Sequence, residues 1–337
     1  MPSTTVVEEV ESGLHRIAVP TPFLVGRVNL YLFMGPPLTL VDTGPNSGTT
    51  LDALERSLAE LDLSVDDIRR VVLTHQHVDH IGLAGVIANR GSAEVLMLDT
   101  LAPYLADWQT SAELDDQMAA EAMTRNGLPR STGEAVKQVA KAYRAFGDSV
   151  LATTSFAPGD SVEIGGVAFK AHWRPGHSPT DTIFIREDGL MIGGDHLLPE
   201  ISSNPVLSRD FLTPAKEGEP LARYRSLPAY LESMRATREM PITKVLPGHG
   251  PVFEGHAELI DSRFASHEKR AQKMLSALDA GPANALQVAQ AIWGEVAAAQ
   301  PFLTFSEVLG HMDVLAEEGH VVETLSADGD SWLFERA

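Results

Sequence analysis

A seven-residue motif constrains this chain more than any other part of its sequence. The motif is Thr74-His75-Gln76-His77-Val78-Asp79-His80, and it directly follows the apolar run Val71-Val72-Leu73. Strand side chains alternate between two faces, so His75 and His77 are expected to point the same way from the end of a strand. Three imidazoles and one carboxylate this close together favour Zn²⁺ or a similar divalent cation.

The composition limits which ligands and partners such a site has. The 337 residues include no cysteine, so any metal ligand is a histidine, a carboxylate or water. The formal net charge of −20 disfavours nucleic acid as the main partner, because phosphate binding requires concentrated Lys and Arg. The first 13 residues do not resemble a signal peptide, and no apolar run approaches 18 residues. We expect a cytoplasmic protein without a membrane span.

Strands and helices alternate through the first hundred residues. The predicted strands are 14–19, 28–33, 38–41, 71–73 and 94–98, and the predicted helices are 48–61 and 80–90. This order predicts an α/β domain whose functional residues lie at the carboxyl ends of strands. Asp42 follows the third strand beside a glycine turn, where a carboxylate is either a helix cap or a site residue.

Residues 101–150 interrupt this alternation, because their composition is typical of helices. Large apolar residues such as Trp108, Met118 and Tyr143 occur singly among acidic residues and alanines. Two interpretations stay open at this point. The segment is either a packed helical insertion or a wall that covers the site, as long insertions between core elements often do.

Three more site candidates follow short strands later in the chain. Strands are predicted at 161–164, 167–173, 181–187, 189–194 and 244–246, with a helix at 220–239. His177 lies in a Pro-Gly-His-Ser-Pro loop, Asp195 follows Gly193-Gly194, and His249 lies in Pro-Gly-His-Gly. A single loop histidine is usually only solvated, so each is weak evidence alone. The remaining histidines lack this setting and are interpreted as structural or surface residues, except His196, which is ambiguous beside Asp195.

Taken in order, these residues resemble the five motifs of the metallo-β-lactamase superfamily over about residues 14–255. The resemblance implies an αββα sandwich, an α/β (α+β) fold, with a two-metal site at one edge, and the helical insertion at about 101–150 lies within it. By resemblance, one metal would be held by His75, His77 and His177, and the second by Asp79, His80 and His249. Asp195 would bridge both metals, and Asp42 would orient the ligands without binding a metal itself.

The lack of cysteine separates this chain from the commonest true β-lactamases, which use one on the second metal. The ligand set resembles the glyoxalase II, lactonase and ribonuclease Z branches instead. Acyl-homoserine lactonases carry a tyrosine just beyond the bridging aspartate, where this chain has Leu197 and Leu198. That difference argues against their particular mechanism.

The C-terminal residues 256–337 are predicted to form a small winged-helix-like domain after a catalytic domain of residues 1–255. Helices are expected at 256–279, 285–298 and 305–318, followed by a hairpin of 321–323 with 332–334. This tail resembles that of the β-lactamase-like protein 2 group, some of whose members are described as endoribonucleases. Residues 260–337 hold 12 acids and only 5 bases, which disfavours nucleic-acid binding. We expect a packing partner, a homodimer contact or a wall of the substrate cleft.

The expected activity is that of a hydrolase with two divalent metal ions, Zn²⁺ first, with Fe or Mn as alternatives. A metal-bridging hydroxide would attack an ester, thioester or lactone of a small metabolite. Asp195 and Asp79 are the candidate catalytic residues, Asp195 as the bridge and Asp79 as a proton acceptor. The alternatives are a phosphodiesterase or endoribonuclease, a non-catalytic ligand-binding protein, and an oxygen- or persulfide-reacting iron enzyme. The sequence does not assign the substrate-binding residues: Ser178, Thr180 and Asp181 bind substrate or only form the turn.

Overall fold

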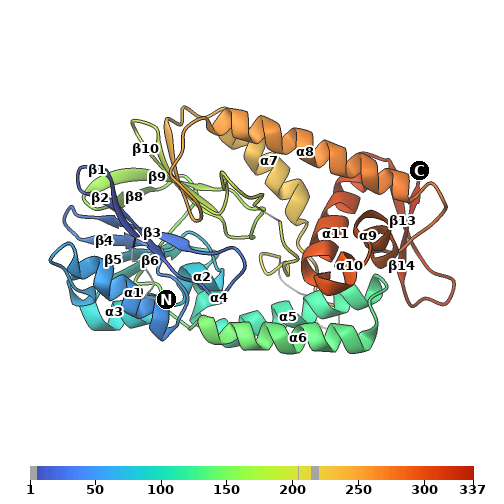
Figure 1. The fold of residues 1–337 in the computed structure, drawn as a ribbon, viewed down its shortest axis with the longest axis horizontal. Coiled ribbons are helices and arrows are strands. Elements are labelled where there is room, and N and C mark those ends of the chain that lie inside the picture. The colour runs from blue at the N-terminus through green and yellow to red at the C-terminus, as the bar shows by residue number, and fades with distance from the viewer. Residues whose placement is uncertain (1–5, 204, 214–219) are drawn as a thin grey trace.

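The computed structural model describes residues 6–203, 205–213 and 220–337, and two β-sheets lie face to face in one half of it (Figure 1). The first sheet has seven strands in sequence order. They are β1 (Val6–Glu11), β2 (Leu14–Val19), β3 (Val28–Phe33), β4 (Thr39–Val41), β5 (Arg70–Val72), β6 (Glu94–Leu98) and β7 (Thr154–Phe156). The first four strands pair antiparallel, and β4 to β7 pair parallel, so the last strands carry their carboxyl ends to one edge.

The second sheet has five strands in the order β12-β11-β10-β9-β8. They are β8 (Ser161–Ile164), β9 (Val167–Trp173), β10 (Thr182–Arg186), β11 (Leu190–Gly194) and β12 (Lys244–Pro247). The meander β8 to β11 is antiparallel, and only β12 runs parallel to its neighbour β11. This parallel pair brings the ends of β11 and β12 together.

Apolar side chains of both sheets form one core between them. Leu30 and Leu40 of the first sheet share this core with Phe169, Phe184 and Leu246 of the second. The helices α1 (Gly48–Ala59) and α3 (Ala84–Gly91) add to it from the outer face of the first sheet. On the other side, α7 (Ser226–Arg238) and α8 (His256–Ala277) pack on β10, β11 and β12. The predicted α/β sandwich, with helices outside two sheets, is therefore confirmed.

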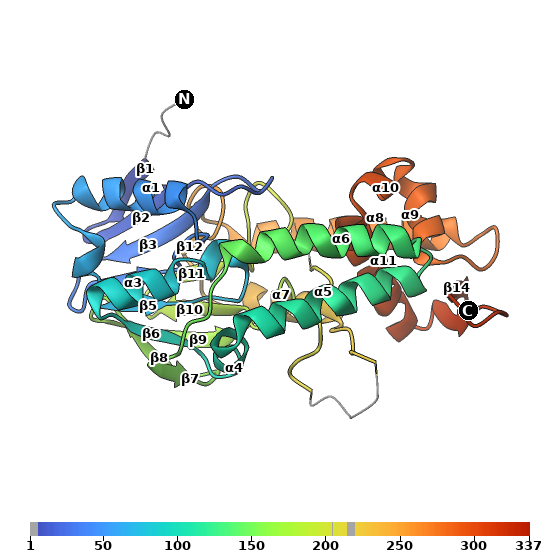
Figure 2. The same cartoon turned by 90° about the horizontal axis from the view of Figure 1, so that it is seen from below.

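The segment between β6 and β7 is helical, as the composition predicted. It forms α4 (Ala102–Ala106), α5 (Trp108–Arg125), α6 (Arg130–Tyr143) and the short 3-10 helix η2 (Arg144–Phe146). The helices α5 and α6 lie side by side and extend from the sheets toward the C-terminal helices (Figure 2). This insertion therefore connects the two ends of the molecule.

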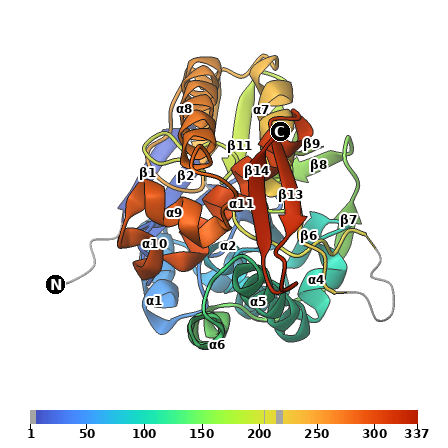
Figure 3. The same ribbon diagram turned by 90° about the vertical axis from the view of Figure 1, so that its right-hand side faces the viewer.

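The C-terminal part contains α9 (Ala285–Trp293), α10 (Val296–Ala299), α11 (Pro301–Glu317) and the hairpin β13 (Val321–Leu325) with β14 (Trp332–Arg336) (Figure 3). The helix α11 contacts α5, α7, α8 and α9. The helix predicted over 285–298 is two helices, because the chain breaks at Gly294 with a φ of 59°, and the helix predicted from 305 begins at Pro301. The predicted hairpin is found, while the winged-helix character and the domain boundary after residue 255 stay predictions. No helix in the described ranges has both the length and the apolarity to cross a bilayer.

Some local predictions were wrong. The helix predicted from residue 220 begins only at Ser226, because Arg223 forms a β-bridge with Arg209 and its guanidinium binds Asp313. The helix predicted over 80–90 is two helices, α2 (Val78–Ile81) and α3. The strands β1 and β7 were not predicted, since each is short or polar and lies at an edge of the first sheet.

Candidate metal centre

The candidate ligands meet at the carboxyl ends of four strands. The strand β5 ends at Val72, and the motif continues from it as a loop that enters α2 with Asp79 and His80. His177 lies between β9 and β10, while Asp195 and His249 follow the adjacent parallel strands β11 and β12. All seven predicted ligands are therefore brought together, although they span residues 75 to 249 in sequence.

Three imidazoles form the first group of ligand atoms. The Nδ1 atom of His77 lies 3.1 Å from Nε2 of His75 and 2.8 Å from Nε2 of His177. Burial, and then the charge of neighbouring His177, lowers the pKa of His77 to about 3, and burial lowers the pKa of His75 well below its usual value. Neutral imidazoles with converging nitrogen lone pairs are the form that a divalent cation requires.

The second group contains two histidines and two carboxylates. The Nε2 atom of His249 lies 3.3 Å from Oδ2 of Asp79 and 3.4 Å from Oδ2 of Asp195. The Oδ1 atom of Asp195 lies 3.4 Å from Nε2 of His80, and the Oδ2 atom of Asp195 lies 3.5 Å from Nε2 of His177. Asp195 thus contacts histidines of both groups, which is the position expected of a bridging ligand.

The electrostatics of the second group favour a positive charge. Burial opposes protonation of His249, but Asp195 and Asp79 overcome it and raise its pKa to about 10. Burial likewise opposes ionisation of Asp195, but His249 and His80 hold its pKa well below the usual range. A bound divalent cation would compete for the same lone pairs as these protons.

Unsatisfied buried atoms test whether a metal fits this cluster. In the described part of the chain, His80 Nε2, His249 Nε2 and Asp195 Oδ1 are buried without a hydrogen bond. Such atoms are costly unless a partner such as an ion satisfies them. The cluster divides into one trio of His75, His77 and His177 and another of Asp79, His80 and His249, with ligand atoms of each within 4.8 Å of one another. The donor set therefore fits two cations.

Asp42 lies behind the cluster, and its contacts match an orienting role. Its Oδ2 accepts hydrogen bonds from Nδ1 of His80 at 2.8 Å and from the hydroxyl of Thr74 at 2.9 Å. Its Oδ1 accepts from the backbone N–H of Thr74 at 2.9 Å. The proton on His80 Nδ1 fixes the tautomer whose Nε2 lone pair faces the cluster. His249 is fixed in the same way, through a 2.7 Å bond from Nδ1 to the carbonyl of Arg27.

Two supporting residues were not recognised as such from the sequence. Thr74 belongs to the predicted motif, but its link to Asp42 was not predicted, and Asp181 was predicted only as a substrate contact or turn former. Asp181 accepts bonds from the N–H and hydroxyl of Ser178 at 2.8 and 2.9 Å, and lies 4.0 Å from Nδ1 of His75. It therefore shapes the loop that presents His177. The signal that points to this kind of residue is a carboxylate that follows a site histidine by a few residues and directly precedes a strand.

Gly248 allows the strand ends to approach the cluster closely. A Cβ at this position would lie 2.1 Å from Oδ1 of Asp195 and 2.8 Å from the ring of His80. The glycine in Pro247-Gly248-His249 is therefore required for steric reasons, since only glycine leaves room for the carboxylate of Asp195.

Histidines that were interpreted as structural lie elsewhere. His267 of α8 and His311 of α11 face each other, with Nδ1 and Nε2 atoms 3.4 Å apart. The nearby Glu307 could complete a ligand trio, but its carboxylate is bonded to Arg270 at 2.8 Å. His196 is buried and bonded to Thr237 at 2.9 Å, so it turns away from its neighbour Asp195.

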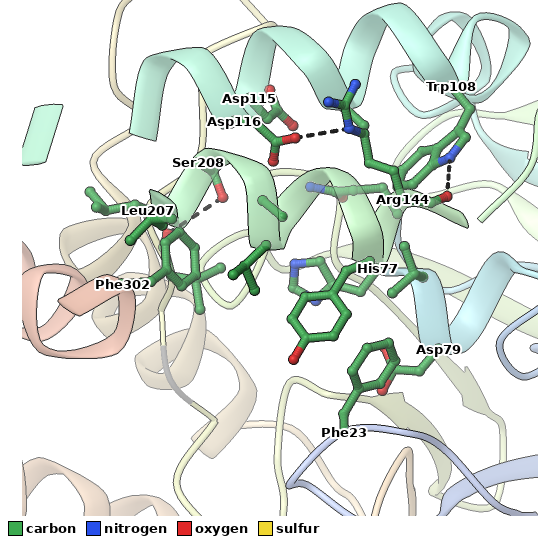
Figure 4. A pocket seen from close by; sticks show the side chains of 18 of the residues that line it. Phe23, His77, Asp79, Trp108, Asp115, Asp116, Arg144, Leu207, Ser208 and Phe302 are labelled. Atoms are coloured by element: carbon green, nitrogen blue, oxygen red, sulfur yellow. Dashed lines mark hydrogen bonds and ion pairs between the residues drawn. The ribbon is translucent and has the colours of Figure 1, made fainter. Parts of the chain in front are cut away.

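A cavity of about 440 Å³ opens beside the cluster (Figure 4). His77, Asp79 and His177 line it on the side of the cluster, and the insertion and α11 provide other walls. Both interpretations of the insertion therefore hold, because α5 and α6 pack together and also line the cavity.

Comparisons with known proteins agree with this arrangement. The sequence profile of the metallo-beta-lactamase superfamily matches residues 25–249. The probable metallo-hydrolase YqjP of Bacillus subtilis is 36% identical over 90% of this chain and 92% of its own length. The beta-lactamase-like protein 2 homolog of Caenorhabditis elegans is 24% identical over 82% of this chain and 76% of its own.

A solved structure extends the similarity to almost the whole chain. The metallo-beta-lactamase family protein TTHA1429 from Thermus thermophilus is 26% identical and superposes with a TM-score of 0.78, covering 97% of this chain and 100% of that one. The profile match covers most of the chain and contains all eight site residues from Asp42 to His249. The chain therefore belongs to the metallo-β-lactamase superfamily.

Proposed function

We propose that this metallo-hydrolase holds two divalent cations and cleaves an ester, thioester or lactone bond of a small molecule. The observation that supports this most directly is the position of the ligand cluster at the wall of a cavity of about 440 Å³. That volume is in the range of small-molecule sites. Zn²⁺ is the first candidate for the metal because the ligands are imidazoles and carboxylates, with Fe and Mn as alternatives.

Each ligand has an assigned task in this proposal. His75, His77 and His177 hold one cation, Asp79, His80 and His249 hold the other, and Asp195 contacts both groups. When bound, such cations supply a water of lowered pKa and polarise the carbonyl oxygen of the substrate. Asp79 lines the cavity, so its carboxylate accepts and relays the proton released as water attacks.

The charges around the cavity favour a carbonyl substrate over a phosphodiester. Among the described residues that line the cavity, Arg144 is the one arginine or lysine, and its Nε lies 2.9 Å from Oδ2 of Asp116. Asp115 also lines the cavity and is bonded to Arg209 at 2.9 Å. A phosphate backbone needs cations that are available to it, and the two arginines beside these carboxylates are already paired with them. We therefore place phosphodiester cleavage second.

The test begins with metal content. Protein purified without added metal is analysed for elements, and about two equivalents of Zn, Fe or Mn are expected per chain. The Asp195→Ala variant should lose metal and turnover together. Full activity in this variant would refute the assigned ligand set, and a wild-type protein that binds no divalent metal would refute the proposal itself.

A substrate panel then separates the reaction classes. The panel contains p-nitrophenyl esters, acyl thioesters, lactones and bis-p-nitrophenyl phosphate, each measured as kcat/KM. We expect at least one acyl substrate to exceed the phosphodiester. Faster turnover of the phosphodiester than of every acyl compound would replace our first choice by the second.

A further inference from the structure

The cavity beside the metal cluster has apolar walls from three separate parts of the chain. Trp108 comes from α5, Val139 and Tyr143 from α6, and Phe302 from α11, while Leu207 belongs to the loop before α7. In Figure 4, His77 and Asp79 lie on one side of the cavity, and Leu207 and Phe302 lie on the other. A ligand that reaches from one side to the other therefore passes between apolar side chains.

Two of these wall residues are exposed although they are large and apolar. Val139 is 55% exposed and Tyr143 is 47% exposed. Neighbouring apolar side chains left open to water beside a cavity are typical of a binding surface. Both belong to α6, which packs along α5 and whose Val136 packs against the core of the C-terminal helices.

The carboxylates and the arginine that the insertion contributes to the cavity wall have partners. The hydroxyl of Tyr104 donates to Oδ2 of Asp115 at 2.7 Å, and Arg209 Nε donates to its Oδ1 at 2.9 Å. Asp116 and Arg144 form the ion pair described above. An ionised group on the ligand at this side of the cavity would therefore lose hydration without gaining a partner among these side chains.

We propose that this cavity binds the acyl portion of the substrate as an uncharged hydrocarbon chain or ring, with the scissile carbonyl beside His77 and Asp79. The inference rests on the proposed function and adds the substrate class: esters or thioesters of apolar monocarboxylic acids. Hydrolysis adds water across the acyl bond, so the products are the apolar carboxylic acid and an alcohol or thiol.

Activity against chain length is the first test. We expect kcat/KM for p-nitrophenyl esters to rise from the acetate to the octanoate by about fourfold for each methylene that becomes buried. Ala140 lines the cavity from α6, so Ala140→Phe should shorten the preferred chain and lower the octanoate rate more than the acetate rate. Ala142 lies on the same helix but is exposed, and Ala142→Phe is the matched control with the wild-type profile.

A charged chain end is the second test. An ester whose acyl chain ends in a carboxylate should react at least tenfold more slowly than the neutral ester of equal length, because burying that charge is costly. A flat chain-length profile, or equal rates for the charged and neutral chains, would overturn the proposed substrate class.

A binding measurement keeps this inference separate from the proposed function. Calorimetry with 1-octanol and the metal-loaded protein should show binding that Ala140→Phe weakens at least tenfold and Ala142→Phe preserves. If no ester is cleaved but octanol binds in this pattern, the hydrolytic proposal fails while the cavity keeps its apolar ligand. If esters are cleaved but octanol binds the two variants equally, the assignment of the cavity to the acyl chain fails while the hydrolytic proposal stands.

Discussion

At the scale of single residues, Asp42 shows how a side chain outside the ligand set supports a metal centre. It is 2% exposed and has a positive φ of 58°, a backbone conformation that asparagine also tolerates. In Asp42→Asn the amide nitrogen cannot accept from Thr74 or His80, so the orientation of His80 is lost. We expect metal affinity to fall by about 10- to 100-fold, measured by competition with a chromophoric chelator.

The matched control for this change is Asp52→Asn. Asp52 is an exposed residue of α1 that pairs with Arg56 on the same helix and is not among the candidate ligands. Its metal affinity should equal that of wild type. Wild-type affinity in Asp42→Asn would show that Asp42 does not orient the ligands.

The sequence was most informative where ligands are neighbours and least informative where supporting contacts are distant. His75, His77, Asp79 and His80 are recognisable because one strand end carries all four. The bonds from Thr74 to Asp42 join residues 32 apart, and no local pattern predicts that they meet. The same is true of Arg27, whose carbonyl fixes His249 across 222 residues.

A second prediction at this scale concerns the buried residue His267. Burial, and then the charges of His311 and Arg270, lower its pKa to about 3. The unfolded chain has a histidine pKa near 6.5 and therefore binds more protons, so stability is lost as pH falls below about 6.5. At pH 5 this penalty is about 2 kcal/mol, and His267→Gln should remove it.

The measurement is urea unfolding of both proteins at pH 7.5 and pH 5. We compare the free energy of unfolding of the variant minus that of wild type at the two pH values. This difference should be about 2 kcal/mol larger at pH 5 than at pH 7.5. His320→Gln, at a position with a 58% exposed side chain, is the control and should follow wild type. A pH-independent difference for His267→Gln would contradict the prediction.

At the scale of elements, an ion pair ties α11 to the segment before α7. Arg223 Nη2 lies 2.6 Å from Oδ1 of Asp313, and Arg225 Nη2 binds the Asp313 carbonyl at 2.9 Å. Because Asp313 is 9% exposed, removing only its main partner leaves a carboxylate poorly compensated. We expect Arg223→Met to cost about 2 kcal/mol in the free energy of unfolding.

A double-mutant cycle with Asp313→Asn tests this contact. The double variant should be less destabilised than the sum of the two single variants by about 1 kcal/mol or more, because each single change leaves the other partner unpaired. The exposed helical pair of Asp52 and Arg56 is the reference cycle, with a coupling below about 0.5 kcal/mol. Strict additivity for Arg223 and Asp313 would mean that the contact carries no stability.

This contact also explains why the helix boundary before α7 was predicted wrongly. Residues 220–225 have helix-compatible composition, but their positions are determined by Arg209, Asp313 and the chain near them. By contrast, strands 14–19, 28–33, 94–98, 161–164 and 167–173 were predicted with the bounds found in the structure. Those strands have alternating or continuous apolar patterns. Such patterns follow from which side chains are buried, so they can be recognised in the sequence alone.

At the scale of the whole molecule, the cavity depends on parts of the chain that lie outside the two sheets. The sheets position the metal ligands, whereas α5, α6 and α11 supply the walls. This division explains why the sequence motifs predict the chemistry but leave the substrate unnamed. Ligands are fixed by short motifs at strand ends, while the walls require knowing how an insertion packs against helices that follow much later in the chain.

The helix α8 links the two ends of the molecule, which leads to a prediction about unfolding. Its Ile260 packs in the core with Tyr230 and β11, and its Met274 packs in the core of the C-terminal helices. Because one continuous helix belongs to both cores, we expect the two parts to unfold in a single transition. Met274 is 0% exposed, so Met274→Ala should create a cavity and lower the melting temperature by about 5 °C.

Calorimetry of the metal-loaded protein measures this directly. Wild type and Met274→Ala should each give one peak, with the whole peak of the variant at lower temperature. Lys273→Ala, at the exposed neighbouring position, is the control and should melt at the wild-type temperature. A variant that splits into an early peak and an unshifted late peak would mean that the C-terminal helices melt alone. In that case the wall residue Phe302 would leave the cavity before the metal ligands separate, and the two parts would be independent folding units.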